Sequence, residues 1–127
     1  MITSEVAEAI DEIRAAFAPS PVTVEEVGDG GAHVVIETVE LDSTYDQDST
    51  WVGFDITFQY PLADVYPHFV RPDLTRRDQA PLGEATSPAA YRGQPAIQLS
   101  RRSNHLNPAT DTAALKALKV ITWLNSH

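Results

Sequence analysis

An alternation of apolar and polar side chains over residues 50–60 is the feature that most limits what this chain can fold into. Every second residue from Val52 to Tyr60 is apolar or aromatic, whereas the positions between them include Asp55 and Gln59. Successive side chains of a β-strand point to opposite faces of its sheet, so this pattern predicts a strand with one buried face. The chain must therefore build a sheet and cover one side of it.

The residues before this strand predict a helix and a hairpin. Apolar residues recur at helical spacing over residues 6–17, and Thr3 or Ser4 can cap the helix that they predict. Two strands are expected over 22–27 and 32–41, because a glycine-rich turn separates two runs of β-forming residues. A helix followed by a three-stranded antiparallel meander is therefore the predicted order of the first half of the chain.

The middle of the chain is punctuated by proline. Five prolines fall between residues 61 and 88, and only residues 65–71 look like a further strand. Residues 72–94 are predicted to form a long flap with little regular structure, and such loops in small domains usually serve a function. The next strand is predicted over 95–100.

The last element is predicted to be a helix opened by Pro108 and capped by Asn107. Leu115 and Leu118 belong to its expected apolar face, whereas its two lysines are expected to be exposed. Together these elements predict one α+β domain over residues 1–127. Its expected parts are an N-terminal helix, an antiparallel meander of about four strands, a long proline-rich flap and a C-terminal helix.

Charge is unevenly distributed along the chain, whose net charge is −9. Residues 1–64 carry fourteen acids and one base, and residues 65–127 carry four acids and eight bases. Either the two halves neutralise each other across the fold, or the arginines form a surface for an acidic partner. A nucleic-acid site is not expected, because no aromatic residues are interleaved with the arginines.

The chain contains no cysteine, which removes thiolate chemistry, disulfides and cysteine-ligated zinc. No spacing of histidines and acids is typical of a metal site, so we expect neither a metal nor another cofactor. Acids are mixed among the apolar residues of the first helix, which is unlike a signal peptide or a membrane span. A cytoplasmic protein that does not enter the membrane is the expectation.

Several short motifs in the second half of the chain can be compared with a known family. They are Tyr60-Pro61, Tyr66-Pro67, Ile97-Gln98-Leu99, His105, Pro108 and Trp123-Leu124. With the order of the predicted elements, they resemble the ubiquitin-conjugating (UBC-like) enzymes, especially their compact bacterial relatives. The resemblance implies an activating enzyme and a ubiquitin-like protein as partners, in a bacterial pathway such as antiphage defence. In that family the position of Gln98 tends to hold the acceptor cysteine.

A conjugating-type carrier without cysteine needs another nucleophile. A serine hydroxyl can serve only with a base in hydrogen-bond reach and with donors for the oxyanion. The segment after Gln98 contains such groups, and Ser100 lies on the same face of the strand as Gln98. The candidate catalytic residues are Ser100 and Ser103 as acceptors, His105 as base, and Asn107 or Asn104 as amide donor. The candidate partner-binding residues are Arg101, Arg102, Arg76 and Arg77.

Three interpretations stay open. The chain is a noncanonical conjugating-type carrier that holds its load as a serine oxyester. Alternatively, it is an inactive UBC-like or RWD-like adaptor that binds the same partners without a covalent load, in which case the polar segment is only a loop. The third is an unrelated α+β module of the nuclear-transport-factor-like kind, which requires an apolar ligand pocket between the sheet and the helices.

Overall fold

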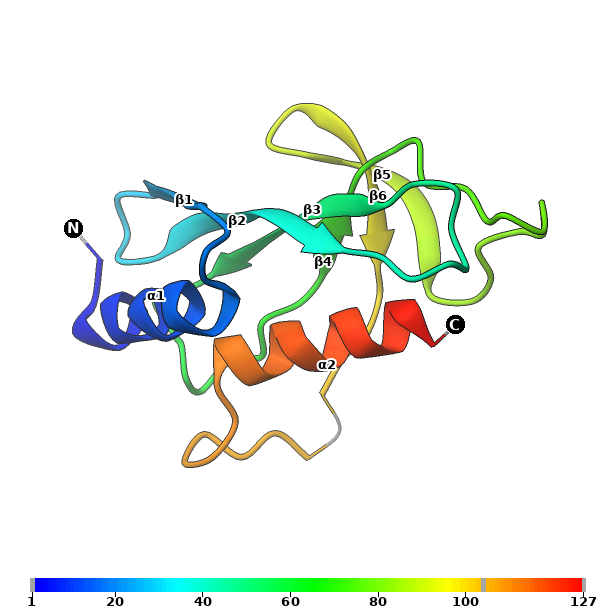
Figure 1. The fold of residues 1–127 in the computed structure, drawn as a ribbon. Helices are drawn as coiled ribbons and strands as arrows, with labels where there is room; N and C mark the ends of the chain where they lie inside the picture. Colours follow the sequence, from blue (N-terminus) through cyan, green and yellow to red (C-terminus); the bar gives the residue numbers. More distant parts are fainter. Residues whose placement is uncertain (1, 104, 127) are drawn as a thin grey trace.

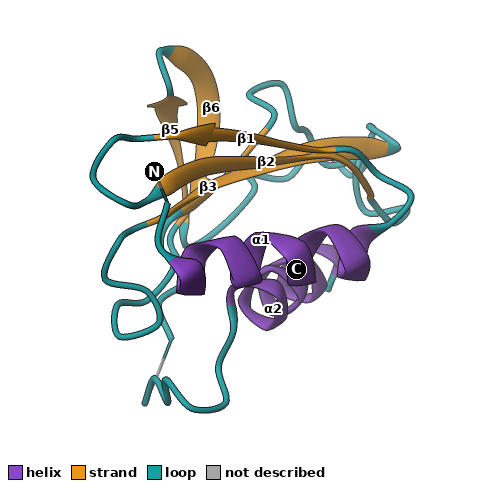
Figure 2. Cartoon of the chain, turned by 90° about the vertical axis from the view of Figure 1, so that its left-hand side faces the viewer, coloured by secondary structure: helices purple, strands orange, loops and turns teal. Residues whose placement is uncertain are grey.

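The computed structural model describes residues 2–103 and 105–126 and has two layers, one sheet and two helices (Figure 1). Along the chain these are α1 (Ser4–Phe17), β1 (Val22–Glu26), β2 (Ala32–Glu40), β3 (Ser49–Ile56), β4 (His68–Val70), β5 (Thr86–Tyr91), β6 (Gln94–Leu99) and α2 (Ala113–Asn125). The sheet is antiparallel with strand order β1-β2-β3-β4-β6-β5, and both helices lie on one side of it (Figure 2). The α+β class with a helix at each end is confirmed.

The local signals of the first half work as expected. The Thr3 hydroxyl accepts a hydrogen bond of 3.1 Å from the backbone N–H of Val6, which makes Thr3 the N-cap of α1. In β3 the residues Val52, Phe54 and Ile56 are buried on the side that faces the helices. No helix in the described part of the chain is long and apolar enough to cross a membrane.

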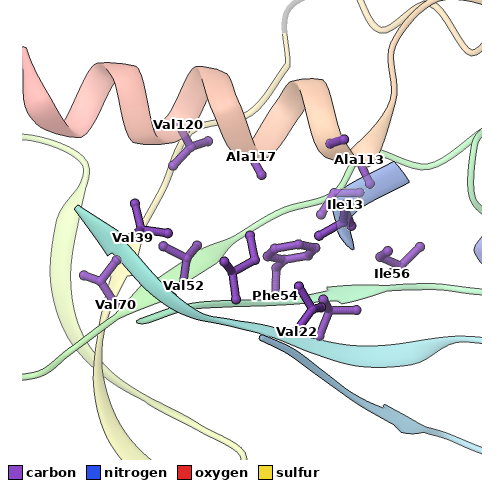
Figure 3. Close-up of a cluster of buried hydrophobic side chains, with 14 of the residues drawn as sticks. Ile13, Val22, Val39, Val52, Phe54, Ile56, Val70, Ala113, Ala117 and Val120 are labelled. Atoms are coloured by element: carbon purple, nitrogen blue, oxygen red, sulfur yellow. The ribbon is translucent and has the colours of Figure 1, made fainter. Parts of the chain in front are cut away.

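Hydrophobic side chains fill the space between the sheet and the helices (Figure 3). Ile13 of α1, Phe54 of β3 and Ala117 and Val120 of α2 all belong to this buried cluster. Each fully buried aliphatic or aromatic side chain contributes roughly 1.5–3 kcal/mol through removal of its surface from water. This packed layer holds α2 against the sheet and so fixes the position of the loop that precedes the helix.

The sheet has six strands where about four were predicted. β4 lies inside the strand-like segment 65–71, and the strand that no sequence signal indicated is β5, which lies inside the expected flap and pairs with β6. Pro88 and the alanines around it have low strand propensity, but proline is compatible with β5 because β5 is an edge strand. The turn between them uses Arg92 and Gly93 at φ of 54° and 81°, the backbone signature of a two-residue hairpin turn.

The β5–β6 hairpin rises from the face of the sheet opposite to the helices (Figures 1 and 2). Tyr91, at its end, donates a hydrogen bond of 2.8 Å from its hydroxyl to the carbonyl of Phe54. Its ring lies on Gly53, where an added Cβ would come within 2.6 Å of the ring. Gly53 is therefore required in β3, because only a residue without a side chain leaves room for the Tyr91 ring.

Helix α2 differs from its prediction in both start and orientation. It begins at Ala113 rather than Pro108, and Thr112 is the N-cap through a 3.1 Å hydrogen bond from the N–H of Leu115. Its buried face contains the small residues of the helix, whereas Leu115 is 46% and Leu118 is 40% exposed. Lys116, predicted to be exposed, is only 9% exposed. The leucines gave the wrong helical phase because alanines contribute little to a hydrophobicity pattern.

Candidate functional site

The loop between β6 and α2 is attached to the rest of the fold by one aspartate. Asp64 accepts hydrogen bonds from both the backbone N–H (2.7 Å) and the hydroxyl (2.8 Å) of Ser103. The Lys116 ammonium donates to both Asp64 oxygens at 3.0 Å and to the Ser103 Oγ at 2.8 Å. We call Asp64, Ser103 and Lys116 the polar cluster, and we call the loop between β6 and α2 the site loop. The polar cluster joins the loop before β4, the site loop and α2.

The polar cluster is a largely buried ion pair with a hydroxyl between its partners. The Lys116 side chain is 10% exposed and the Asp64 side chain 20%. Burial raises the pKa of Asp64, but the hydrogen bonds from Ser103 and Lys116 outweigh it and hold this pKa below its ordinary value. A carboxylate with a lowered pKa is a weak base. The Ser103 hydroxyl is therefore held in place in this arrangement rather than activated.

A buried histidine lies close to this cluster. His68 of β4 is fully buried against Phe54, with ring centroids 5.0 Å apart, and neither of its ring nitrogens has a hydrogen-bond partner among the described residues. Burial, together with the positive charge of Lys116, lowers the pKa of His68 to about 3. The imidazole is therefore neutral at neutral pH.

A cavity of about 170 Å³ opens beside the polar cluster, between the site loop and α2. Half of its lining residues are basic, and the lining consists of Arg101, Arg102, Ser103, Asp111, Lys116, Lys119, Val120 and Trp123. The guanidinium carbon of Arg101 lies 5.0 Å from the centre of the Trp123 ring, and that of Arg102 lies 4.1 Å from the centre of the Tyr66 ring. We call this cavity the basic pocket.

The predicted acceptor and base are not brought together by the described contacts. The Ser100 hydroxyl accepts a hydrogen bond of 3.1 Å from the Gln98 amide, and its N–H donates to the carbonyl of Ala85 at 2.7 Å. His105 is exposed at a φ of 56° and has no hydrogen-bond partner among residues 2–103 and 105–126. Of the two candidate serines, it is Ser103 that contacts a charged pair.

Of the two candidate amide residues, only Asn107 lies within the described part of the chain. Asn107 does not cap α2, which corrects its predicted role as N-cap. Its side chain accepts from the N–H of Ala109 at 3.0 Å, and its own N–H donates to Asp111 at 2.8 Å, so it shapes a turn in the site loop. Asn104 lies outside the described residues.

The two predicted arginine pairs have different surroundings. Arg76 makes two hydrogen bonds to the Asp78 carboxylate, at 3.0 and 2.9 Å, and Arg77 donates to the carbonyl of Tyr45 at 3.2 Å. These contacts fix the segment after β4 against the loop before β3. Of these four arginines, Arg101 and Arg102 line the basic pocket, whereas Arg76 and Arg77 do not.

Sequence reasoning missed Asp64 and Lys116 and the roles of two tyrosines. The Tyr60 hydroxyl accepts from the N–H of Ala113 at 3.1 Å, which satisfies a free donor at the start of α2, and Tyr66 carries Arg102. Both tyrosines precede proline, so the two Tyr-Pro motifs were the available signal. For Lys116 the available signal was the helical spacing of the alanines in α2, which places Lys116 on the buried face.

A second polar group lies on the opposite face of the sheet. Asp55 accepts from the Tyr91 hydroxyl at 2.9 Å and lies 2.6 Å from Nδ1 of His33. Burial and the Asp55 charge raise the pKa of Tyr91. An ion pair between Arg92 and Glu25 holds the same hairpin to β1. These contacts fasten the β5–β6 hairpin.

No family model matches this chain, and no curated protein or solved structure does so either. The function must therefore be argued from the site. In the described part of the chain, no three histidine, aspartate or glutamate side chains converge to hold a metal ion. The strongest chemical feature is a set of cations around a pocket, which is suited to binding an anionic group.

Proposed function

We propose that this chain is a UBC-like adaptor of a bacterial ubiquitin-like pathway, which binds its partners without accepting a covalent load. The order of helix, antiparallel strands, site loop and helix supports the UBC-like interpretation, as do the contacts of Tyr60 and Tyr66 with the site region. The basic surface at Arg101 and Arg102 is the part of the site that would contact the acidic side of a partner.

The state of Ser103 is the observation that carries the adaptor role. Its proton is donated to a carboxylate of lowered pKa, and its oxygen already accepts from an ammonium group. An acyl acceptor needs a good base for its proton and an electron-rich oxygen, whereas here the base is weak and the ammonium group draws electron density from the oxygen. Acylation would also break the hydrogen bond that ties the site loop to Asp64.

A serine oxyester carrier is the second candidate, and the Lys116 ammonium 2.8 Å from the Ser103 hydroxyl favours it. A fixed cation beside the acceptor can stabilise the negative charge that develops on oxygen during the attack. In that reaction the Ser103 Oγ would attack the thioester carbonyl on the activating enzyme, its proton would pass to Asp64, and the enzyme thiolate would leave. Ser103, and not Ser100, would be the acceptor.

The test combines this protein with ATP, a bacterial activating enzyme and its ubiquitin-like protein. We expect a complex on size exclusion and no mass increase by intact mass spectrometry. We also expect Arg101→Ala combined with Arg102→Ala to weaken the complex, and Arg76→Ala, a matched arginine already paired with Asp78, to leave it unchanged. An adduct that survives thiol, is cleaved by hydroxylamine and is lost in Ser103→Ala would establish the carrier instead. Absence of any complex would overturn the UBC-like assignment.

A further inference from the structure

The basic pocket contains the three cations for which the described residues show no ion pair and no hydrogen bond. The chain has 18 acids for 9 lysines and arginines, so acidic partners are abundant. Arg71, Arg76, Arg92 and Lys116 each form an ion pair, and Arg14 and Arg77 donate to backbone carbonyls. Within residues 2–103 and 105–126, no carboxylate pairs with Arg101, Arg102 or Lys119. All three line the same cavity.

The two arginines of the pocket are held for planar recognition. The cation–π contacts of Arg101 with Trp123 and of Arg102 with Tyr66 restrain each guanidinium, and neither guanidinium donates a hydrogen bond to another described residue. The N–H edge of a guanidinium matches the two oxygens of a carboxylate, which it binds with two parallel hydrogen bonds. Because stacking already restrains the side chains, less conformational entropy is lost when a ligand binds.

The other residues that line the basic pocket indicate which chemical groups of the ligand lie next to its carboxylate. Val120 and Trp123 add apolar surface, and Asp111 adds a carboxylate that can accept from an N–H and repels a second negative charge. We propose that the basic pocket binds a single carboxylate joined to an apolar group and an amide N–H. Both a free N-acyl amino acid and the last residue of a peptide have this chemistry. The inference goes beyond the proposed function and requires no partner protein.

The test is a calorimetric titration of the unmodified chain with N-acetyl-leucine. Its amide, N-acetyl-leucinamide, is the matched ligand without the charge, and inorganic phosphate probes a general anion site. We expect saturable binding of the acid, at least about tenfold weaker binding of the amide, and weaker binding of phosphate. A short peptide ending in leucine then separates the two sources, because tighter binding than N-acetyl-leucine identifies a peptide terminus and equal binding identifies the free acid.

Variants locate the binding in the pocket. Arg102→Gln and Lys119→Gln should each weaken binding of N-acetyl-leucine about tenfold, whereas Arg76→Gln should leave it unchanged. In a Trp51→Phe background, Trp123 is the single tryptophan and its fluorescence gives a second readout at the pocket. Equal affinity for acid and amide, tighter binding of phosphate, no saturation, or no effect of Arg102→Gln would each overturn the proposal. Because no partner is present, its failure leaves the adaptor role standing, and absence of partner binding leaves the pocket standing.

Discussion

Two arginine pairs that look alike in the sequence do different work in the fold. Arg76 and Arg77 are consumed by Asp78 and by the carbonyl of Tyr45, and they hold one loop against another. Arg101 and Arg102 are stacked on aromatic rings beside a cavity and have no carboxylate partner among the described residues. The first pair is part of the architecture, and the second is available to a ligand.

The position of acids along the sequence accounts for part of this contrast. Arg71 and Arg76 each have an aspartate two positions further on, and each is neutralised by it. Between Glu84 and Asp111 there is no acidic residue at all, and Arg101 and Arg102 fall inside that gap. Arg92 falls inside the same gap but is neutralised by Glu25 of β1, so distance in sequence from an acid marks candidates for binding residues and the tertiary contacts decide among them.

Acid should destabilise the protein through His68, near the site region, far more than through the Arg76–Asp78 pair. His68, below the site region, is neutral in the folded state with a pKa near 3, whereas its ordinary value is 6.5. The unfolded chain therefore binds a proton first, so stability falls as pH drops from about 6.5 to about 3. A shift of this size amounts to about 5 kcal/mol. The Arg76–Asp78 pair behaves differently, because the hydrogen bonds from Arg76 lower the Asp78 pKa to about 2 and the pair persists down to that pH.

Urea unfolding of the protein and of His68→Leu between pH 7 and pH 4 measures this effect. Leucine is close to histidine in volume and leaves no unpaired ring nitrogen in the core, so the variant should match or exceed the parent at pH 7. Its stability should fall less with acid than that of the parent. Parallel loss in both proteins would contradict the assignment of His68 as the acid-sensitive group.

The next effect tests the ion pair of the polar cluster. Asp64→Ala leaves the Lys116 ammonium nearly buried without a counter-charge and removes both bonds that hold Ser103. The free energy of unfolding should fall by about 3 kcal/mol in chemical denaturation. Adding Lys116→Met to this variant removes the stranded charge and should recover part of the loss. A loss well below 1 kcal/mol in Asp64→Ala would mean that the cluster is solvated in solution.

The smallest effect concerns the neutralised arginines. Asp73→Asn removes the negative charge and one of the two oxygens that accept hydrogen bonds from Arg71, but the Asp73 side chain is 61% exposed. Solvent screening limits the expected cost to below about 1 kcal/mol, and the cost should shrink further in high salt. Thermal melts in low and high salt measure it. A cost as large as that of Asp64→Ala would remove the distinction between a surface pair and a buried one.

Much of the fold followed from the sequence where neighbouring residues decide the outcome. The caps and hairpin of the first half and the alternation of β3 depend on local backbone and solvent preferences, and they were predicted. β5 was missed because pairing with β6 overrides the weak propensity of its proline and alanines. The start of α2 was missed because Tyr60, distant in sequence, satisfies its first N–H.

The site was predicted as a segment but not as a set of contacts. Ser103, Arg101 and Arg102 were named from the sequence, and the structure places them around one pocket. Asp64 and Lys116 come from elements that only the tertiary fold brings to Ser103, and the helical phase that buries Lys116 is set by packing against the sheet. The assignment of His105 as a base and Ser100 as acceptor stays a prediction.

The position of Pro88 in an edge strand has a consequence for how copies of this protein meet. An open sheet exposes unpaired backbone groups at both ends, and these can recruit a strand from another molecule. At the β5 end, Pro88 cannot donate a hydrogen bond to an added strand. At the β1 end, the edge strand is only five residues long and carries two glutamates, and short charged edge strands are poor templates for an added strand. Neither end of the sheet invites extension, so crowded copies of the chain should stay separate rather than grow into β-aggregates.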